Sequence, residues 1–298
     1  MLVQRLFFGA LLIAALLGLL YVDSRLGVWF AREAGPYDPS GALVTAVLAA
    51  LLWMGSRELD GLMRAGGYAP LRTWPALMIV LLAATPFLAL TRIMPTTYEP
   101  PPVANLTLAL LTAATFGSFF LVGCRRQSDG AIANVALTLF AILYLGLLGQ
   151  FIARLSLAGG VPMVLYYVAV VKCCDIGAYF TGLAVGRHKL IPWLSPKKTW
   201  EGLAGGIGAS VLVAIFLPRL LAPQSIFGEA ASLPAAAPAA LFGLVMAVVG
   251  QAGDLFESLL KRSAEAKDSA AAVPAFGGIL DIIDSILLTA PVAYWLLT

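Results

Sequence analysis

Charged side chains are concentrated in one stretch, residues 250–284. Apolar sequence long enough to span a bilayer flanks this stretch on both sides. A charge in hydrocarbon costs about 2.5–3.5 kcal/mol on insertion scales, so such residues are kept for a partner or a function. On a helix, positions i, i+3, i+4 and i+7 share one face, and this spacing joins Asp254, Glu257, Ser258 and Lys261. Asp281 and Asp284 share a face of the next helix. Carboxylates that converge beside cations are suited to metal-assisted phosphate chemistry.

A basic loop at residues 186–202 is the second candidate feature. Its core, Ser195-Pro196-Lys197-Lys198-Thr199, places two cations and two hydroxyls directly before a helix that carries Glu201. Helix N-termini attract phosphate through free N–H groups and the helix dipole, and lysines add point charges. A cytoplasmic loop that touches anionic lipid head groups has the same composition. Taken alone, the loop favours this second interpretation, because basic cytoplasmic loops are common.

A third group, Lys172, Asp175 and Tyr179, shares one face of a predicted span. Charges inside a membrane usually pair, so Lys172 and Asp175 would neutralise each other. Asp175 would also suit the wall of a polar cavity, and the two interpretations are compatible. His188 is the only histidine in the sequence, and Ser258 has no histidine at a plausible distance. This argues against an acyl-enzyme mechanism, which needs a base beside its nucleophile.

The composition defines the elements that must position these residues. The chain has 298 residues, of which 60% are hydrophobic and 12% charged, and its mean hydropathy is +0.91. Soluble domains are nearer half apolar and a quarter charged, so we predict an all-α, polytopic helical membrane protein. The three cysteines form neither a disulfide framework nor a metal-binding spacing.

Apolar runs of span length predict about nine transmembrane helices. They lie at 6–22, 41–55, 74–94, 103–123, 131–153, 161–183, 200–221, 239–260 and 277–297. Residues 56–68 suit an interfacial helix, residues 95–102 a stiff turn, and residues 222–238 a loose loop. We expect residues 1–160 to be a scaffold of transmembrane helices and residues 161–298 to be the catalytic part, with motif loops in the cytoplasm.

The distribution of basic residues predicts the orientation. With nine spans, 13 of the 19 lysines and arginines fall on the side of the N-terminus, 5 fall on the other side, and Lys172 lies within a span. The positive-inside rule then places the N-terminus and both motif loops in the cytoplasm. We therefore expect an integral protein of the cytoplasmic (inner) membrane whose active site faces the cytoplasm.

Several separated blocks, in this order, resemble the phosphatidate cytidylyltransferase (CDP-diacylglycerol synthase) family. The resemblance covers roughly residues 165–295. It rests on Asp175-x-Gly177-Ala178-Tyr179-Phe180, Ser195-Pro196-Lys197-Lys198-Thr199-Trp200-Glu201-Gly202, Gly250-Gln251-x-Gly253-Asp254, Ser258-x-x-Lys261-Arg262 with Lys267-Asp268, and Gly277-Gly278-x-x-Asp281-x-x-Asp284. The family usually has His and Arg where this chain has Phe276 and Ile282.

The resemblance implies transfer of CMP from CTP to phosphatidic acid, which gives CDP-diacylglycerol and pyrophosphate. It implies Mg²⁺ as the cofactor, with a second cation as an open alternative. Catalytic roles would fall to Asp254, Asp281, Lys261 and Lys267, and metal ligation to Asp254, Asp281 and Asp284. Substrate contacts would come from Asp175, Ser195, Lys197, Lys198, Thr199, Glu201, Ser258, Arg262 and Asp268. CTP and membrane phosphatidic acid would be the partners, not nucleic acid, and a homodimer stays open.

Three alternatives remain at this point. An ion-coupled transporter would also carry intramembrane charges, although such proteins often show two related halves and no repeat is evident here. A CTP-dependent lipid kinase would share the nucleotide and the membrane but release CDP. A catalytically silent homologue would explain Phe276 and Ile282.

Overall fold

The computed structural model describes residues 18, 21–23, 25, 41–90, 103–125, 128–220, 236–265 and 278–298. Within these ranges six helices are long and apolar enough to cross a membrane: Ala42–Ala65, Val103–Gly123, Ala131–Val185, Trp200–Pro218, Ala236–Ser263 and Leu280–Leu297. A shorter apolar helix spans Thr73–Ala89. The predicted class, a polytopic helical membrane protein, is therefore confirmed. The count of nine spans stays a prediction, because the first predicted span and the turn at 95–102 lie largely or wholly outside the described residues.

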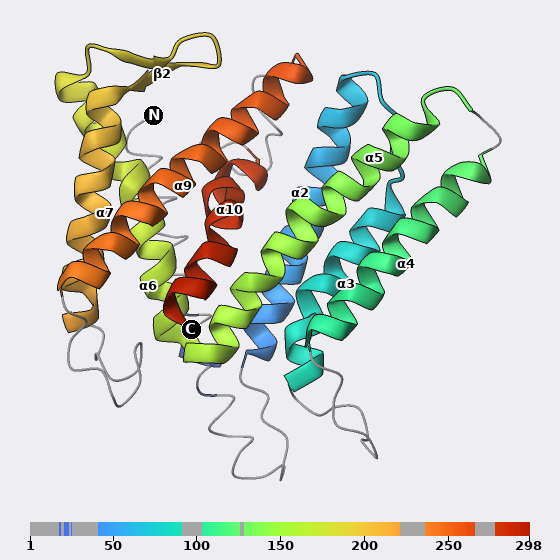
Figure 1. Cartoon of the computed structure of the whole chain (residues 1–298), viewed down its shortest axis with the longest axis horizontal. Helices are drawn as coiled ribbons and strands as arrows, with labels where there is room; N and C mark the ends of the chain where they lie inside the picture. The colour runs from blue at the N-terminus through green and yellow to red at the C-terminus, as the bar shows by residue number, and fades with distance from the viewer. Residues whose placement is uncertain are drawn as a thin grey trace. The chain divides into compact units, whose positions relative to one another are not determined.

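The chain divides into two compact units. The first comprises Met1–Leu157 and Ser263–Asp281, and the second comprises Ala158–Arg262 and Ile282–Thr298. The first unit contains α2 (Ala42–Ala65), α3 (Thr73–Leu90), α4 (Val103–Gly123), α5 (Ala131–Ala141) and the π-helical turn η1 (Ile142–Leu147) (Figure 1). Its apolar core includes Met78 and Leu82 of α3, packed with Ala114 and Ile142. The predicted division into scaffold and catalytic parts concerns roles and stays a prediction.

Helix α2 is longer than the sequence suggested. The predicted interfacial helix at 56–68 is wrong as a separate element, because α2 continues through Ser56 to Ala65. No proline interrupts this segment, and Arg64 donates from Nε to both carboxylate oxygens of Asp60, at 3.0 and 2.9 Å. This i, i+4 pair supports the helix where the sequence becomes polar. The helix ends at a glycine pair, where Gly67 has a φ of 84° that other residues rarely adopt.

Helix α6 (Leu148–Val185) contains a break at Gly160, whose φ of 65° and ψ of −161° are not helical. Only glycine adopts these angles without a steric penalty. The uninterrupted segment Ala131–Val185 would have 55 residues and a length of about 80 Å at 1.5 Å per residue, far more than a bilayer core of about 30 Å. The break lies between the spans expected at 131–153 and 161–183.

The second unit contains the rest of α6, the strands β1 (Lys189–Ile191) and β2 (Ser195–Thr199), α7 (Trp200–Leu220), α9 (Ala236–Ser263) and most of α10 (Leu280–Leu297). Buried tyrosines of α6 tie its helices together. The Tyr166 hydroxyl donates to the carbonyl of Ala214 at 3.2 Å, and the Tyr167 hydroxyl donates to that of Ile286. Each hydroxyl therefore satisfies a backbone carbonyl of another helix.

The motif loop between α6 and α7 is a β-hairpin, which the sequence reasoning missed (Figure 1). Strands β1 and β2 pair antiparallel, with Lys189 opposite Thr199 and Ile191 opposite Ser195. β2 runs directly into α7, so the basic motif lies on an ordered strand rather than on an irregular loop. The hairpin was hard to predict because two strands of three and five residues show almost no alternation of apolar and polar side chains.

Helices α9 and α10 approach each other closely at Gly253. A Cβ added at Gly253 would lie 2.9 Å from the carbonyl oxygen of Asp284 and 3.1 Å from the Cα of Ser285. Any larger residue would push α10 away from α9. This contact brings Asp254, which follows Gly253, close to the side chain of Asp284 within the second unit.

Candidate functional site

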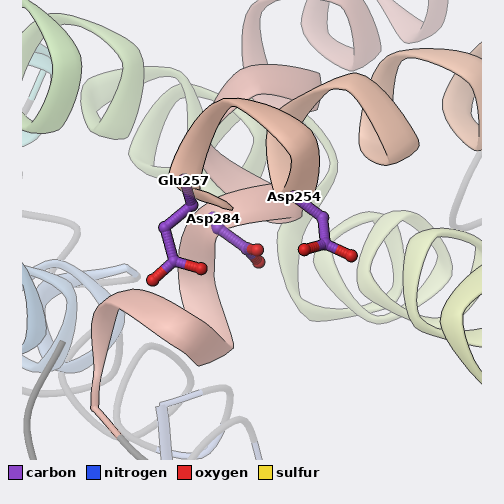
Figure 2. A group of neighbouring side chains, drawn as sticks. All are labelled: Asp254, Glu257 and Asp284. Carbon is purple, nitrogen blue, oxygen red and sulfur yellow. The ribbon is translucent and has the colours of Figure 1, made fainter. Parts of the chain in front are cut away.

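Three carboxylates of the second unit gather where α9 meets α10. One oxygen each from Asp254, Glu257 and Asp284 lies within 4.8 Å of the other two, and Figure 2 shows two of these side chains on α9 and one on α10. Glu257 is 2% exposed and Asp284 is 4% exposed, whereas Asp254 is partly accessible. We call this group the acidic cluster. Its charges repel one another, so the fold must supply compensating cations or a bound metal.

Two lysines compensate part of this charge. The Lys198 ammonium of β2 lies 2.6 Å from Asp254 Oδ2, and the Lys261 ammonium lies 3.0 Å from Glu257 Oε2. The two lysine side chains are only 18% and 16% exposed. The Lys198 pair connects the hairpin motif directly to the α9 motif, which the sequence placed far apart.

A third lysine connects α6 to α10 beside the cluster. Lys172 Nζ donates to Ser285 Oγ at 2.8 Å and to Asp175 Oδ2 at 3.2 Å. Ser285 is fully buried, and its N–H donates to Asp284 Oδ1 at 2.5 Å. The predicted Lys172–Asp175 ion pair is present. Ser285 links this pair to Asp284.

Other motif residues hold the hairpin in place. Glu201 accepts from the backbone N–H groups of Arg187 and His188, at 3.1 and 3.2 Å, and its Oε1 lies 2.6 Å from His188 Nδ1. Thr199 Oγ1 accepts from the N–H of Gly202 at 3.1 Å, the usual N-cap arrangement at the start of a helix. These contacts position β2, which carries Lys198.

Asp281 is not a member of the acidic cluster. It stands in the first turn of α10, where its Oδ2 accepts from the N–H of Gly278 at 2.8 Å. Glu58 of α2 accepts from the next two N–H groups, those of Ile279 and Leu280, at 2.8 and 3.0 Å. Carboxylates thus satisfy three backbone donors at this helix start, where the helix dipole favours negative charge. The predicted metal role of Asp281 stays a prediction.

Of the remaining predicted residues, those that the structure describes lie on β2, α9 and α10. Lys197 is exposed and Ser195 is half-buried on β2, while Ser258 is half-buried on α9. Arg262 donates from Nε to the carbonyl of Leu194 at 3.5 Å, so it touches the hairpin. Ile282 is half-buried on α10. Lys267, Asp268 and Phe276 lie outside the described residues.

The acidic cluster fits a hard divalent cation. Its donors are all carboxylate oxygens, the ligands that Mg²⁺ prefers, and Mg²⁺ typically takes few protein ligands and completes its octahedron with water and phosphate oxygens. Two of the three carboxylates are almost fully buried, where uncompensated charge is costly. No nitrogen or sulfur donor of a described residue belongs to the group, which disfavours a zinc-type site.

Sequence reasoning did not name Glu257 as a candidate metal ligand, although a signal was present. Glu257 lies three residues after Asp254 on the face already recognised, so the helical period alone would have nominated it. The contact from Lys172 to Ser285 had no such signal, because it joins residues 113 positions apart.

Comparisons with known proteins identify the family of the chain. The sequence profile of the Cytidylyltransferase family matches residues 34–298. A protein named phosphatidate cytidylyltransferase from Chlamydia pneumoniae is 32% identical over 262 residues, covering 84% of this chain and 80% of that protein. Proteins of the same name from Synechocystis sp. and Bacillus subtilis are 31% and 37% identical, covering 86% and 67% of this chain and 88% and 71% of their own lengths. The chain belongs to the cytidylyltransferase family.

Proposed function

We propose that this protein transfers CMP from CTP to phosphatidic acid and releases pyrophosphate. Three relatives that carry the name phosphatidate cytidylyltransferase, each 31–37% identical to this chain, support the substrate pair. The observation that carries the proposal is the ion pair of 2.6 Å between Lys198 and Asp254. This ion pair places a lysine, which can bind phosphate, beside a carboxylate cluster that can bind a metal ion. Transfer of a nucleotidyl group between two phosphates requires both kinds of group in one site.

The acidic cluster would hold the cofactor. Asp254, Glu257 and Asp284 supply three carboxylates within 4.8 Å of one another, and we assign them to Mg²⁺. When bound, Mg²⁺ screens the repulsion between the two anionic substrates and stabilises charge on the leaving pyrophosphate. Asp281, which the sequence predicted as a metal ligand, lies three residues before Asp284 on α10 and would suit a second cation.

The basic residues of the hairpin and of the end of α9 would hold the phosphates: Lys197, Lys198, Lys261 and Arg262. Lys198 and Lys261 already lie beside the carboxylates, and Lys197 is exposed on the same strand as Lys198. The nucleophile is a phosphate oxygen of phosphatidic acid, which is ionised at neutral pH, so the chemistry needs no side-chain base. The bond between this oxygen and the α-phosphorus of CTP forms as the bond to pyrophosphate breaks. The residues therefore act by orientation and charge compensation.

The acidic cluster lies near helix ends, a location that suits one substrate from water and one from the membrane. Asp254 is nine residues from the end of α9 and Asp284 four residues from the start of α10, which is within about 14 Å of the helix ends at 1.5 Å per residue. We propose that these ends face the cytoplasm, since the basic residues favour that orientation. CTP would then enter from the cytoplasm and phosphatidic acid from the adjacent leaflet of the cytoplasmic membrane.

The proposal is tested with purified protein, labelled CTP, phosphatidic acid and Mg²⁺. We expect labelled CDP-diacylglycerol and pyrophosphate in equal amounts. Release of CDP with phosphorylated lipid would identify a lipid kinase instead. Solute uptake into sealed vesicles without consumption of CTP would identify a transporter, and a protein that binds CTP without turnover would be a silent homologue.

A further inference from the structure

The carboxylates assigned to the metal are already engaged by lysines. Lys198 Nζ lies 2.6 Å from Asp254 Oδ2, and Lys261 Nζ lies 3.0 Å from Glu257 Oε2. Both lysine side chains are more than four-fifths buried, and Glu257 is buried as well, so water screens the Lys261 pair only weakly, whereas the Asp254 side chain is 38% exposed and water screens the Lys198 pair more. The protein therefore supplies its own counter-ions where the cofactor and the substrate phosphates would bind.

A divalent cation and an ammonium cannot share one of these carboxylates comfortably. Mg²⁺ binds carboxylate oxygens at about 2.0–2.1 Å, and Lys198 lies 2.6 Å from the same group. The two cations would be a few Å apart beside a carboxylate that is only partly exposed, so their repulsion opposes joint binding even where water screens part of it. Metal binding at Asp254 should therefore displace Lys198, and the displaced ammonium needs another anion because it is largely buried.

In the proposed reaction, the phosphates of CTP are the anion that the displaced Lys198 ammonium can bind. We infer that Lys198 is an internal counter-ion that exchanges Asp254 for nucleotide phosphate when a divalent cation binds. The inference rests on the proposed function and adds a linkage to it. Binding of the metal to Asp254 releases Lys198 for the nucleotide, and binding of the nucleotide to Lys198 releases Asp254 for the metal. The metal and the nucleotide therefore bind cooperatively, and the coupling is reciprocal.

The contacts around Lys198 hold the backbone of the hairpin, so the Lys198 ammonium can move while the backbone keeps its place. The hairpin is fastened at its base by Glu201, which accepts from the N–H groups of Arg187 and His188. Near its turn, the carbonyl of Leu194 accepts from Arg262 Nε. Lys198 lies on β2 between these two attachments, and its flexible four-carbon stem can swing the ammonium between neighbouring anions. The exchange is therefore a change of side-chain rotamer at one residue.

The first arm of the test measures metal binding without nucleotide. Purified wild-type protein and the Lys198→Met variant are titrated with Mn²⁺, a probe for carboxylate sites, and free Mn²⁺ is followed by electron paramagnetic resonance. Without its competitor, the cluster should bind Mn²⁺ about tenfold more tightly in the variant, within the usual range of coupling between sites. A lysine that merely supports the fold would give equal or weaker metal binding.

The second arm measures nucleotide binding without metal. Equilibrium dialysis with labelled CTP in excess EDTA compares the wild type with Asp254→Asn, which frees Lys198 from its partner. We expect the variant to bind metal-free CTP about tenfold more tightly, although it loses turnover. Lys189→Met is the matched control in both arms, because it removes an exposed lysine of the same hairpin and should change neither affinity.

Both increases are required, and the absence of either overturns the exchange. If Lys198→Met does not yield folded protein, Lys198→Gln replaces it in the first arm, because glutamine removes the charge and keeps an N–H donor for Asp254. Failure of the exchange differs from failure of the proposed function. A wild type that releases pyrophosphate while neither variant gains affinity refutes the exchange alone, whereas a wild type without CTP binding or turnover in Mg²⁺ refutes the proposed function.

Discussion

Replacing Asp284 with asparagine should stabilise the metal-free protein and abolish its activity. Asp284 is 4% exposed, and its carboxylate lies within 4.8 Å of those of Asp254 and Glu257. Two unit charges at 4.8 Å repel by about 3.5 kcal/mol at an effective dielectric constant of about 20. Lys172 offsets part of this repulsion at Asp284, so we expect a net gain of about 1–2 kcal/mol in the free energy of unfolding. Asparagine keeps the acceptor that Ser285 N–H uses.

The assay compares thermal unfolding and turnover of the detergent-solubilised variant with those of the wild type. In EDTA, the Tm of Asp284→Asn should rise by about 2–8 °C, since 1 kcal/mol shifts Tm by about 2–4 °C in domains of about 150–250 residues. In Mg²⁺, the wild type should gain stability and the variant should gain little. CMP transfer should fall at least about 100-fold, which corresponds to about 2.7 kcal/mol in the activation free energy.

Asp281→Asn is the matched control, because it removes an equal charge from the same helix one turn earlier. Asp281 accepts a hydrogen bond from the N–H of Gly278 and is not a member of the acidic cluster, so its replacement should not stabilise the metal-free protein. Its effect on turnover decides whether the metal-ligand role predicted for Asp281 from the sequence holds. If Asp284→Asn lowers the Tm in EDTA and keeps more than about a tenth of the activity, the reasoning about the cluster is refuted.

Three further predictions test how the site is positioned. Gly253→Ala should lower CMP transfer more than about tenfold, because its Cβ would meet the Asp284 carbonyl oxygen at 2.9 Å; Gly208→Ala, where a Cβ meets nothing within 4 Å, should leave the rate unchanged. Thr199→Ala should cost about 1 kcal/mol of stability through loss of the α7 cap, and Thr199→Ser should restore it; equal unfolding temperatures would contradict the cap. Glu58→Ala should destabilise the protein by about 2 kcal/mol, more than Glu58→Gln, because it leaves two N–H groups of α10 without their acceptor; an unchanged denaturation midpoint would refute this.

The sequence by itself determined the class of protein and the helices that carry the chemistry. Long apolar runs require helices, since a bilayer leaves no other way to satisfy the backbone of a single segment. The i, i+3 and i+4 spacing placed Asp254 and Glu257 on one face of α9, because positions within one helix follow from its period alone. The ordered blocks indicated the family, which the comparisons confirm.

Only the tertiary structure decided which charges meet. The sequence did not predict the hairpin, the continuation of α2 to Ala65, or the contact of Lys198 with Asp254. It also did not select Glu257 to join Asp254 and Asp284 within 4.8 Å. These contacts depend on how closely helices approach, and a missing side chain at Gly253 sets that distance for α9 and α10. A helical period fixes the face on which a residue lies, whereas its partner on another element is fixed only by packing.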